Sequence, residues 1–254
     1  MTPFFRNIRK KMADDNKPMK YVRYAIGEIL LVVIGILIAL QINNWNDERL
    51  EKIEERKLIS NINQEFVNNL KNLDSTILHI DTLVPSLSLL MLSMSEPSSN
   101  VYKGEKLNEL LVNCSQIPPK WKRSDINVKG IESSDNLGRI KNEKLKQLLY
   151  NWFGINENVK AMEQSGEAAF LTYINYIKEN GSWREIDKLA NFGNAISGGS
   201  ILMPDNDHLL LDYKFENVVD DHLAWLLNRN REYRATRVHL EKIINESLKP
   251  NSTE

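Results

Sequence analysis

The sequence predicts a mainly α-helical protein: one N-terminal transmembrane helix, followed by an extramembrane bundle of three long helices with short connecting helices. Three observations lead to this prediction. An uninterrupted apolar run follows a basic N-terminal stretch, three later segments repeat apolar residues at helical spacing, and no alternation typical of a β-strand has useful length. The 254 residues leave room for one sizeable domain beyond the membrane helix.

Residues 1–23 form a basic tail. They contain seven Lys and Arg residues against Asp14 and Asp15, although the whole chain has a formal net charge of -1. A basic stretch beside an apolar one is typical of a topology signal, and no aromatic or Gly-rich motif of an RNA-binding domain accompanies it. We therefore expect no nucleic-acid partner.

Residues 24–42, with the sequence YAIGEILLVVIGILIALQI, are expected to cross a lipid bilayer once. A helix of this length spans roughly 28 Å, close to the thickness of the hydrocarbon layer. A buried helix of a soluble domain is the alternative, but the preceding cations and the following Trp45 favour a membrane. No small-x-small pattern follows the run, so we expect it to stay uncleaved. The positive-inside rule then places residues 1–23 in the cytoplasm and residues 43–254 on the opposite side.

Glu28 is the residue of this span that most invites a functional interpretation, because an ionisable group within a membrane is costly and often functional. In one interpretation, Glu28 from several copies lines a proton or cation path, or pairs with a basic residue of a partner's membrane helix. In the other, which we favour, Glu28 lies roughly 7 Å beyond Arg23 and reaches headgroups or water by snorkelling.

The same span contains a pattern of small residues that favours helix–helix packing in membranes. Gly35 and Ala39 form a small-xxx-small pair, and Gly27 lies on nearly the same face. This pattern predicts self-association or contact with another membrane protein. The expected anchors at the two membrane interfaces are Arg23, Tyr24 and Trp45.

Two blocks of the sequence resemble a family of Bacteroidota single-pass membrane proteins, a family built on a domain of unknown function. The first is YAIGEILLVVIGILIALQINNWNDER at residues 24–49, and the second runs from Gly130-Ile131-Glu132-Ser133-Ser134 to Leu137 and Asn142-Glu143. Asp135-Asn136 stands where the family pattern has a Gly-containing turn. The resemblance extends over the whole chain and implies an inner-membrane protein with a periplasmic C-terminal domain. It supplies no activity and no catalytic residues.

Beyond the span, apolar residues at heptad spacing predict a helix over residues 45–94, with Pro85 kinking or breaking it. Further long helices are expected over 143–178, capped by Asn142, and from Asp212 to the Lys249-Pro250 stop. Short helices are predicted at 105–114 and 183–191, and residues 121–140 are expected to be mostly irregular.

Three long helices with apolar seams bury those seams against one another, and the simplest arrangement is an up-down bundle. The alternative is an intermolecular coiled coil, in which the seam from Leu58 to Met94 pairs with its copy in a dimer. The sequence is compatible with both.

The sequence contains no recognisable catalytic or metal motif. The four histidines, His79, His208, His222 and His239, have no metal-ligand spacing, and the single Cys114 excludes a disulfide framework and a thiolate metal site. We interpret His222 as a hydrogen-bonded core or boundary residue and Asp205-Asn206-Asp207-His208 as a solvated turn and helix cap, since an EF-hand would need a further Gly and Glu. Four tryptophans, Trp121, Trp152, Trp183 and Trp225, are expected to pack in the core, with a ligand cleft as the alternative.

We therefore expect no enzyme, no cofactor and no metal. The favoured function is a membrane-anchored helical module of the cell envelope that binds a partner protein or ligand in the periplasm. The alternative is a subunit of an ion-coupled membrane complex that uses Glu28. A cell-wall hydrolase would require a buried acid pair, which the sequence does not reveal.

Overall fold

The computed structural model describes residues 18–95, 101–132, 135–190 and 198–249, and every regular element within those ranges is a helix. The elements are α2 (Pro18–Ser95), α3 (Glu105–Cys114), α4 (Ile126–Glu132), the 3-10 helix η2 (Asp135–Arg139), α5 (Glu143–Asn180), α6 (Trp183–Leu189), the 3-10 helix η3 (Asp207–Leu211) and α7 (Tyr213–Ser247). The chain divides into two compact units, residues 1–57 and 58–254. The mainly helical fold expected from the sequence is confirmed.

Helix α2 is 78 residues long and contributes to both units. It continues through Pro85, so the predicted break there is wrong, and a kink at Pro85 stays a prediction. Proline removes the amide that would bond to the carbonyl of Asp81. However, Leu83 and Leu87 on either side are buried in the core, and this packing holds the helix together despite the missing hydrogen bond.

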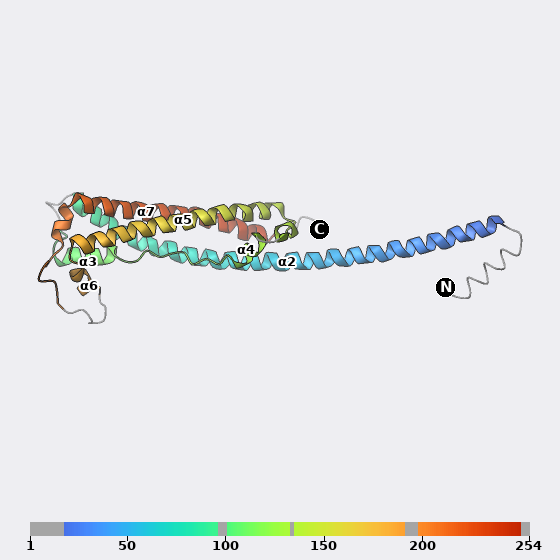
Figure 1. Cartoon of the computed structure of the whole chain (residues 1–254), viewed down its shortest axis with the longest axis horizontal. Helices are drawn as coiled ribbons and strands as arrows, with labels where there is room; N and C mark the ends of the chain where they lie inside the picture. The colour runs from blue at the N-terminus through green and yellow to red at the C-terminus, as the bar shows by residue number, and fades with distance from the viewer. Residues whose placement is uncertain (1–17, 96–100, 133–134, 191–197, 250–254) are drawn as a thin grey trace. The chain divides into compact units, whose positions relative to one another are not determined.

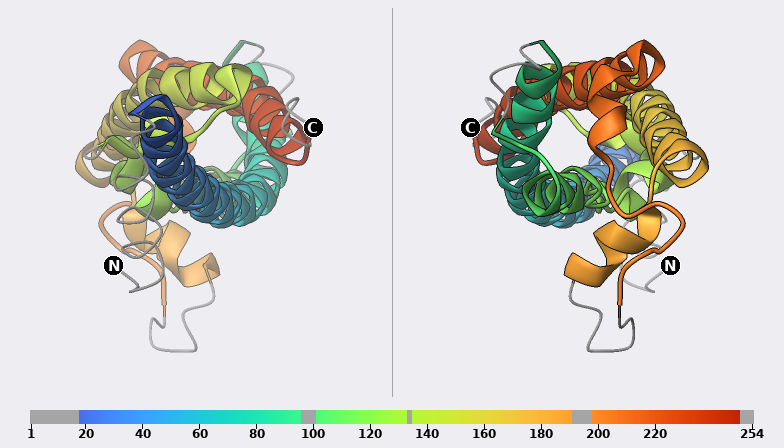
Figure 2. Two further views of the ribbon diagram at one scale, coloured as in Figure 1. Left: turned by 90° about the vertical axis from the view of Figure 1, so that its right-hand side faces the viewer. Right: turned by 90° about the vertical axis from the view of Figure 1, so that its left-hand side faces the viewer.

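In the second unit, the C-terminal part of α2 lies beside α5 and α7 (Figures 1 and 2). Three pairs link α2 to α7 in antiparallel order: Asn63 with Ser247 at 2.7 Å, Asp74 with Arg237 at 2.7 Å and Asp81 with Arg234 at 2.7 Å. The apolar seam of α2, including Ile62, Phe66, Leu73 and Leu87, is buried in one core with residues of α5 and α7. The seam therefore packs within one chain, and the coiled-coil dimer alternative is not needed to bury it.

The bundle is not a simple up-down one. Helices α5 and α7 are also antiparallel, since Tyr173 stacks near Phe215 and Glu163 accepts a hydrogen bond from Tyr233. Helices α2 and α5 consequently run in the same direction. Residues 101–132 return along the bundle between them, through α3, an irregular segment and α4 (Figure 1).

The Asn142 cap predicted from the sequence is present, and Asp212, near which the last long helix is expected to start, is also a cap. The Asn142 side chain accepts a hydrogen bond from the Leu145 amide at 3.0 Å at the start of α5. The Asp212 side chain likewise accepts from the Lys214 amide at 2.9 Å at the start of α7. Such caps satisfy amides that have no partner within the helix. They fix where both long helices begin.

Candidate functional site

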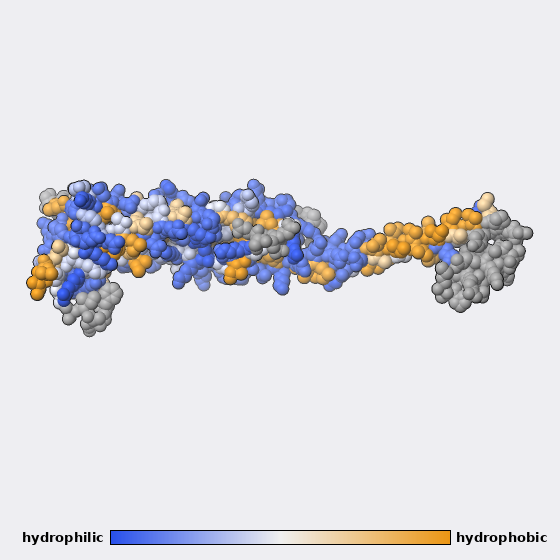
Figure 3. All heavy atoms as spheres, in the orientation of Figure 1, coloured by the Kyte–Doolittle hydropathy of each residue, from blue (hydrophilic) through white to orange (hydrophobic). Residues whose placement is uncertain are grey.

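The first candidate site is an apolar band on α2 over residues 25–42. Its large side chains are exposed, for example Leu31 at 72% and Leu37 at 58%, and none of its most apolar 18-residue window is buried. Figure 3 shows the band as an orange stretch of α2. Among the described residues, α2 is the one helix long and apolar enough to cross a membrane, although a signal sequence near an N-terminus has the same properties.

The residues singled out in this band lie on one helix. Glu28 is partly exposed, whereas Arg23, Ala39 and Trp45 are exposed. Only the backbone of Tyr24 is described. A Cβ built on Gly27 or Gly35 would have open space around it, with nothing within 4 Å. Packing against these small residues therefore needs a second helix and stays a prediction.

The second feature is the irregular segment of residues 115–125, which we call the strap. Trp121 in its middle is 3% exposed, and its indole ring packs edge-on against Trp152 of α5 and Tyr233 of α7. Its Nε1 donates a hydrogen bond to the Asn69 carbonyl of α2 at 2.9 Å. The strap thus joins all three long helices, as core packing of this tryptophan predicted.

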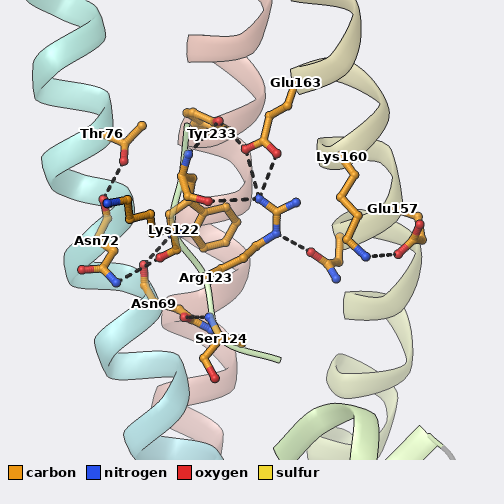
Figure 4. A network of polar contacts seen from close by, with 12 residues as sticks. Asn69, Asn72, Thr76, Lys122, Arg123, Ser124, Glu157, Lys160, Glu163 and Tyr233 are labelled. Atoms are coloured by element: carbon orange, nitrogen blue, oxygen red, sulfur yellow. Dashed lines mark hydrogen bonds and ion pairs between the residues drawn. The ribbon is translucent and has the colours of Figure 1, made fainter. Parts of the chain in front are cut away.

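Polar contacts fix the strap on both sides of Trp121 (Figure 4). On the α5 side, Arg123 donates two hydrogen bonds to Glu163, at 3.0 and 3.1 Å, and a third to Asn156 at 2.6 Å. The Tyr233 hydroxyl donates to the same Glu163 at 2.6 Å, and burial together with this carboxylate raises the pKa of that hydroxyl. Both side chains of the ion pair are nearly buried, so the network acts as a structural clamp.

Buried polar side chains also lie between α5 and α7. His222 is 2% exposed and lies against the rings of Phe170 and Tyr173, at 5.3 and 5.4 Å between centroids. Burial, and secondarily the charge of Arg229, lowers the pKa of His222 to about 4. Neither its Nδ1 nor the Tyr173 hydroxyl has a hydrogen bond of ordinary geometry among the described residues. Of the two positions expected for His222, core and boundary, the structure shows the core, but the expected hydrogen bond is absent at Nδ1 in the described part of the chain.

Arg229 is a buried cation beside His222. It is 3% exposed, and its Nε has no hydrogen-bond partner among the described residues. Burial lowers the pKa of its guanidinium, while Tyr233, Glu163 and Glu167 act in the opposite direction. Because carboxylates already surround this cation, the surroundings do not favour a bound anion.

The clearest binding surface is a groove of about 510 Å³ between α3, α5 and α6. This volume is typical of a ligand site, roughly 300–1,000 Å³. Mostly apolar side chains line it, and Trp183, one of the four tryptophans singled out in the sequence, is among them. The lining residues are Val112, Ser115, Gln116, Ile117, Phe170, Ile174, Trp183, Ile186, Asp187 and Ala190.

Next to α6 the chain presents a second unusual surface, the segment of residues 198–203. Ile201 and Leu202 are 98% and 97% exposed, which is rare for neighbouring large apolar side chains. From the sequence alone, Ser197-Gly198-Gly199-Ser200 is expected to be a flexible turn. The signal of the exposed pair was the Ile-Leu-Met run directly after Gly198-Gly199-Ser200.

No group of three or more His, Cys, Asp or Glu side chains that could hold a metal ion occurs in the part of the chain that the structure describes. Asp205 and Asn206 directly precede η3, and the Asp207 amide donates a hydrogen bond to the Asp205 carboxylate at 3.1 Å, as in a turn. The expectation of a solvated turn and helix cap is wrong for Asn206, which is fully buried, and no side-chain hydrogen bond from the described residues caps η3. The Asp207 carboxylate accepts a hydrogen bond from the Gly104 amide at 2.6 Å.

Residues 28–91 match the model of a family of unknown function (DUF6090). The match covers most of the apolar band and the part of α2 that enters the bundle, and the block at residues 130–143 lies outside it. No curated protein and no solved structure matches the chain.

Proposed function

We propose that this protein is a membrane-anchored helical interaction module of the cell envelope. Residues 24–42 hold it in the inner membrane, residues 1–23 face the cytoplasm, and residues 43–254 form a periplasmic domain that binds a protein partner through apolar surface. In this proposal the chain is not an enzyme and uses no cofactor.

The observation that carries the proposal is the exposure of the apolar band. From Ile26 to Ile42 every Val, Leu and Ile side chain is between 46% and 72% exposed, on all sides of the helix. A helix that is apolar all round requires an apolar environment on all sides. A bilayer supplies one, and the hydrocarbon thickness matches the length of the band.

The orientation follows from the charges at the two ends of the band. Seven cations precede it, whereas the stretch after Trp45 mixes Arg and Lys with Asp and Glu. The positive-inside rule weighs Lys and Arg near the span and places the richer side in the cytoplasm.

Membrane fractionation tests the anchor. The full chain, expressed in a Gram-negative host, should stay in the membrane pellet through alkaline carbonate and keep its mass of 29.4 kDa. Leu31→Arg should shift most of the protein out of the pellet, because a charge near the middle of a span costs roughly 2.5–3.5 kcal/mol. Leu78→Arg is the matched control, since Leu78 is similarly exposed, at 66%, but lies outside the band. A carbonate-soluble or shortened wild-type chain contradicts the proposal.

Protease access tests the orientation. In spheroplasts, external protease should digest the region after Trp45 while an epitope tag at the N-terminus stays protected. In inverted membrane vesicles the pattern should reverse. Digestion of the C-terminal region only in the inverted vesicles would place that domain in the cytoplasm and contradict the assignment.

The second candidate is a subunit of an ion-coupled complex, and the position of Glu28 within the band is the observation that favours it. Glu28→Gln separates the two roles, because it removes the charge and keeps the shape. If the substitution changes ion or proton flux in membranes while insertion and partner binding persist, Glu28 serves conduction. If ion and proton flux are unchanged, only the anchor role remains.

A further inference from the structure

Two apolar features adjoin α6. One is the groove between α3, α5 and α6, and the other is the exposed pair Ile201 and Leu202. We infer that the segment of residues 198–203 of one copy docks into this groove of a second copy. The inference deepens the proposed function, since it names the partner as the chain itself.

The segment is held in a defined shape at its base. The Ser200 amide donates to the Glu185 carboxylate of α6, and the Met203 amide donates to the Ser200 hydroxyl at 3.1 Å. Gly198 has φ +80, a conformation that L side chains rarely adopt, and a Cβ on Gly199 would lie 2.2 Å from Glu185 Oε1. The two glycines therefore allow the chain to lie close to α6 and turn outward.

This fixed base means that Ile201 and Leu202 are presented before binding. A preformed segment loses less conformational freedom on docking than a free loop, so more of the apolar burial appears as affinity. Figure 3 shows orange side chains at the end of the helical unit that contains α3 and α6, within a largely blue surface.

The two faces of α6 explain why the occupant comes from another molecule. Trp183, Ile186 and Ala190 line the groove on one face of α6. Glu185, on another face, holds the segment 198–203, whose apolar tip is almost completely exposed rather than seated in its own groove.

A second copy is the simplest partner, because one chain contains both halves of the contact. If the tip of copy one enters the groove of copy two, a twofold axis beside the two α6 helices lets the tip of copy two enter the groove of copy one. Such a reciprocal contact is the usual form of a homodimer interface. Each pair of chains then buries two tips and fills two grooves.

The size of this contact fits a membrane-anchored pair. Two short tips in two grooves cover less than the roughly 1,600 Å² typical of a stable interface, so the contact is weak between freely diffusing chains. Anchoring both copies in one membrane makes docking a local event at high effective concentration. The small residues Gly35 and Ala39 in the band would add to this proximity.

Cysteine cross-linking between two tagged copies tests the inference. Full-length chains with different epitope tags are co-expressed, one with Leu202→Cys and the other with Ile117→Cys, and their membranes are treated with a short bis-maleimide. Ile117 lines the groove and is 78% exposed. The native Cys114 can stay, because it is buried and burial raises the pKa of its thiol.

The matched control pairs Leu202→Cys with Ile126→Cys, since Ile126 is also 78% exposed but lies on α4, away from the groove. We expect a product carrying both tags at least tenfold above this control. Ala190→Trp, which fills the groove, should reduce the product at least fivefold, and an unchanged circular dichroism spectrum confirms that this variant folds.

Three outcomes would overturn the inference. The first is a product no stronger than the Ile126 control. The second is an internal cross-link in a separately made chain that carries both Leu202→Cys and Ile117→Cys. The third is capture of other envelope proteins in place of the second copy. Carbonate extraction of the same samples reports on the membrane anchor independently of the docking. A soluble chain that still cross-links through the groove contradicts only the anchor, and a membrane-bound chain without the product contradicts only the docking.

Discussion

Trp121 and Asn69 are 52 residues apart in the sequence, yet the indole Nε1 of Trp121 donates a hydrogen bond to the backbone carbonyl of Asn69. The Asn69 side chain adds two more contacts to the strap, accepting from the Ser124 amide and donating to the Ser124 carbonyl, both at 2.7 Å. Asn69 of α2 thus forms three hydrogen bonds with the strap, one through its carbonyl and two through its side chain. These contacts satisfy polar groups of an irregular segment that is partly buried.

The first prediction concerns this pairing. Asn69 is 1% exposed, so Asn69→Ala removes two partly buried hydrogen bonds to the Ser124 backbone and should lower the free energy of unfolding by about 1–3 kcal/mol, at about 0.5–1.5 kcal/mol for each bond. Denaturant unfolding of the detergent-solubilised full chain, followed by tryptophan fluorescence, measures the loss. The control is Asn72→Ala, because Asn72 also donates to the strap, at the Lys122 carbonyl, but in an exposed setting. Equal losses in the two variants would show that burial of Asn69 does not matter.

The second prediction concerns the clamp formed by Arg123 and Glu163. Arg123→Met leaves a nearly buried carboxylate with only the Tyr233 hydroxyl as donor, so it should lower the free energy of unfolding by about 3 kcal/mol. Removing both charges, with Arg123→Met and Glu163→Met together, should cost less than the single change, because no uncompensated charge remains. A double variant less stable than Arg123→Met in the same unfolding assay would contradict this reasoning.

The long helices could be predicted from the sequence because their signals are local. The spacing of apolar residues and the caps Asn142 and Asp212 lie within a few residues of the helix ends that they specify. The helix at Glu105–Cys114 has the expected bounds for the same reason.

The strap and the direction of α5 could not be predicted in this way. Residues 115–125 have no period, and their structure depends on partners far away in the sequence, such as Asn69 and Glu163. A tryptophan after Pro118-Pro119 was the one available hint. The groove depends similarly on α3, α5 and α6 meeting in space, although Trp183 was singled out beforehand.

The third prediction compares two glycines. A Cβ at Gly166, inside α5, would meet Arg229 Nη1 at 3.8 Å and Trp225 Cβ at 3.9 Å, both ordinary contacts. Gly166→Ala should therefore raise the free energy of unfolding by about 0.5–1 kcal/mol, since glycine is unfavourable within a helix.

Gly181 should respond in the opposite direction. A Cβ there would lie 2.7 Å from Asn206 Oδ1 and 2.9 Å from Leu209 Cδ1. Asn206 is fully buried and bonds to Asn108 and Ser182, so it has little room to move. Gly181→Ala should lower the free energy of unfolding by about 1–3 kcal/mol. Thermal unfolding of both variants beside the wild type measures the signs, and a shared sign would contradict the account of one of them.

The fourth prediction is a pH dependence that arises from His222. Its pKa is lowered to about 4, against 6.5 in an unfolded chain, first by burial and then by Arg229. Between these values the unfolded chain binds a proton that the folded chain excludes, so stability falls as the pH falls from about 6.5 to 4. The full effect is about 3 kcal/mol, from roughly 1.4 kcal/mol for each pKa unit.

His222→Phe removes this dependence and keeps an aromatic ring against Phe170 and Tyr173. The difference in unfolding free energy between the wild type and this variant should therefore change by about 3 kcal/mol between pH 7 and pH 4, in favour of the variant at low pH. Glu246, whose pKa is lowered from 4.5 to about 2, loses its contribution as the pH falls from about 4.5 to 2, but it is present in both proteins and cancels in this difference. A difference that stays constant across this range would mean that His222 takes up protons equally in the folded and unfolded chains, contrary to its burial.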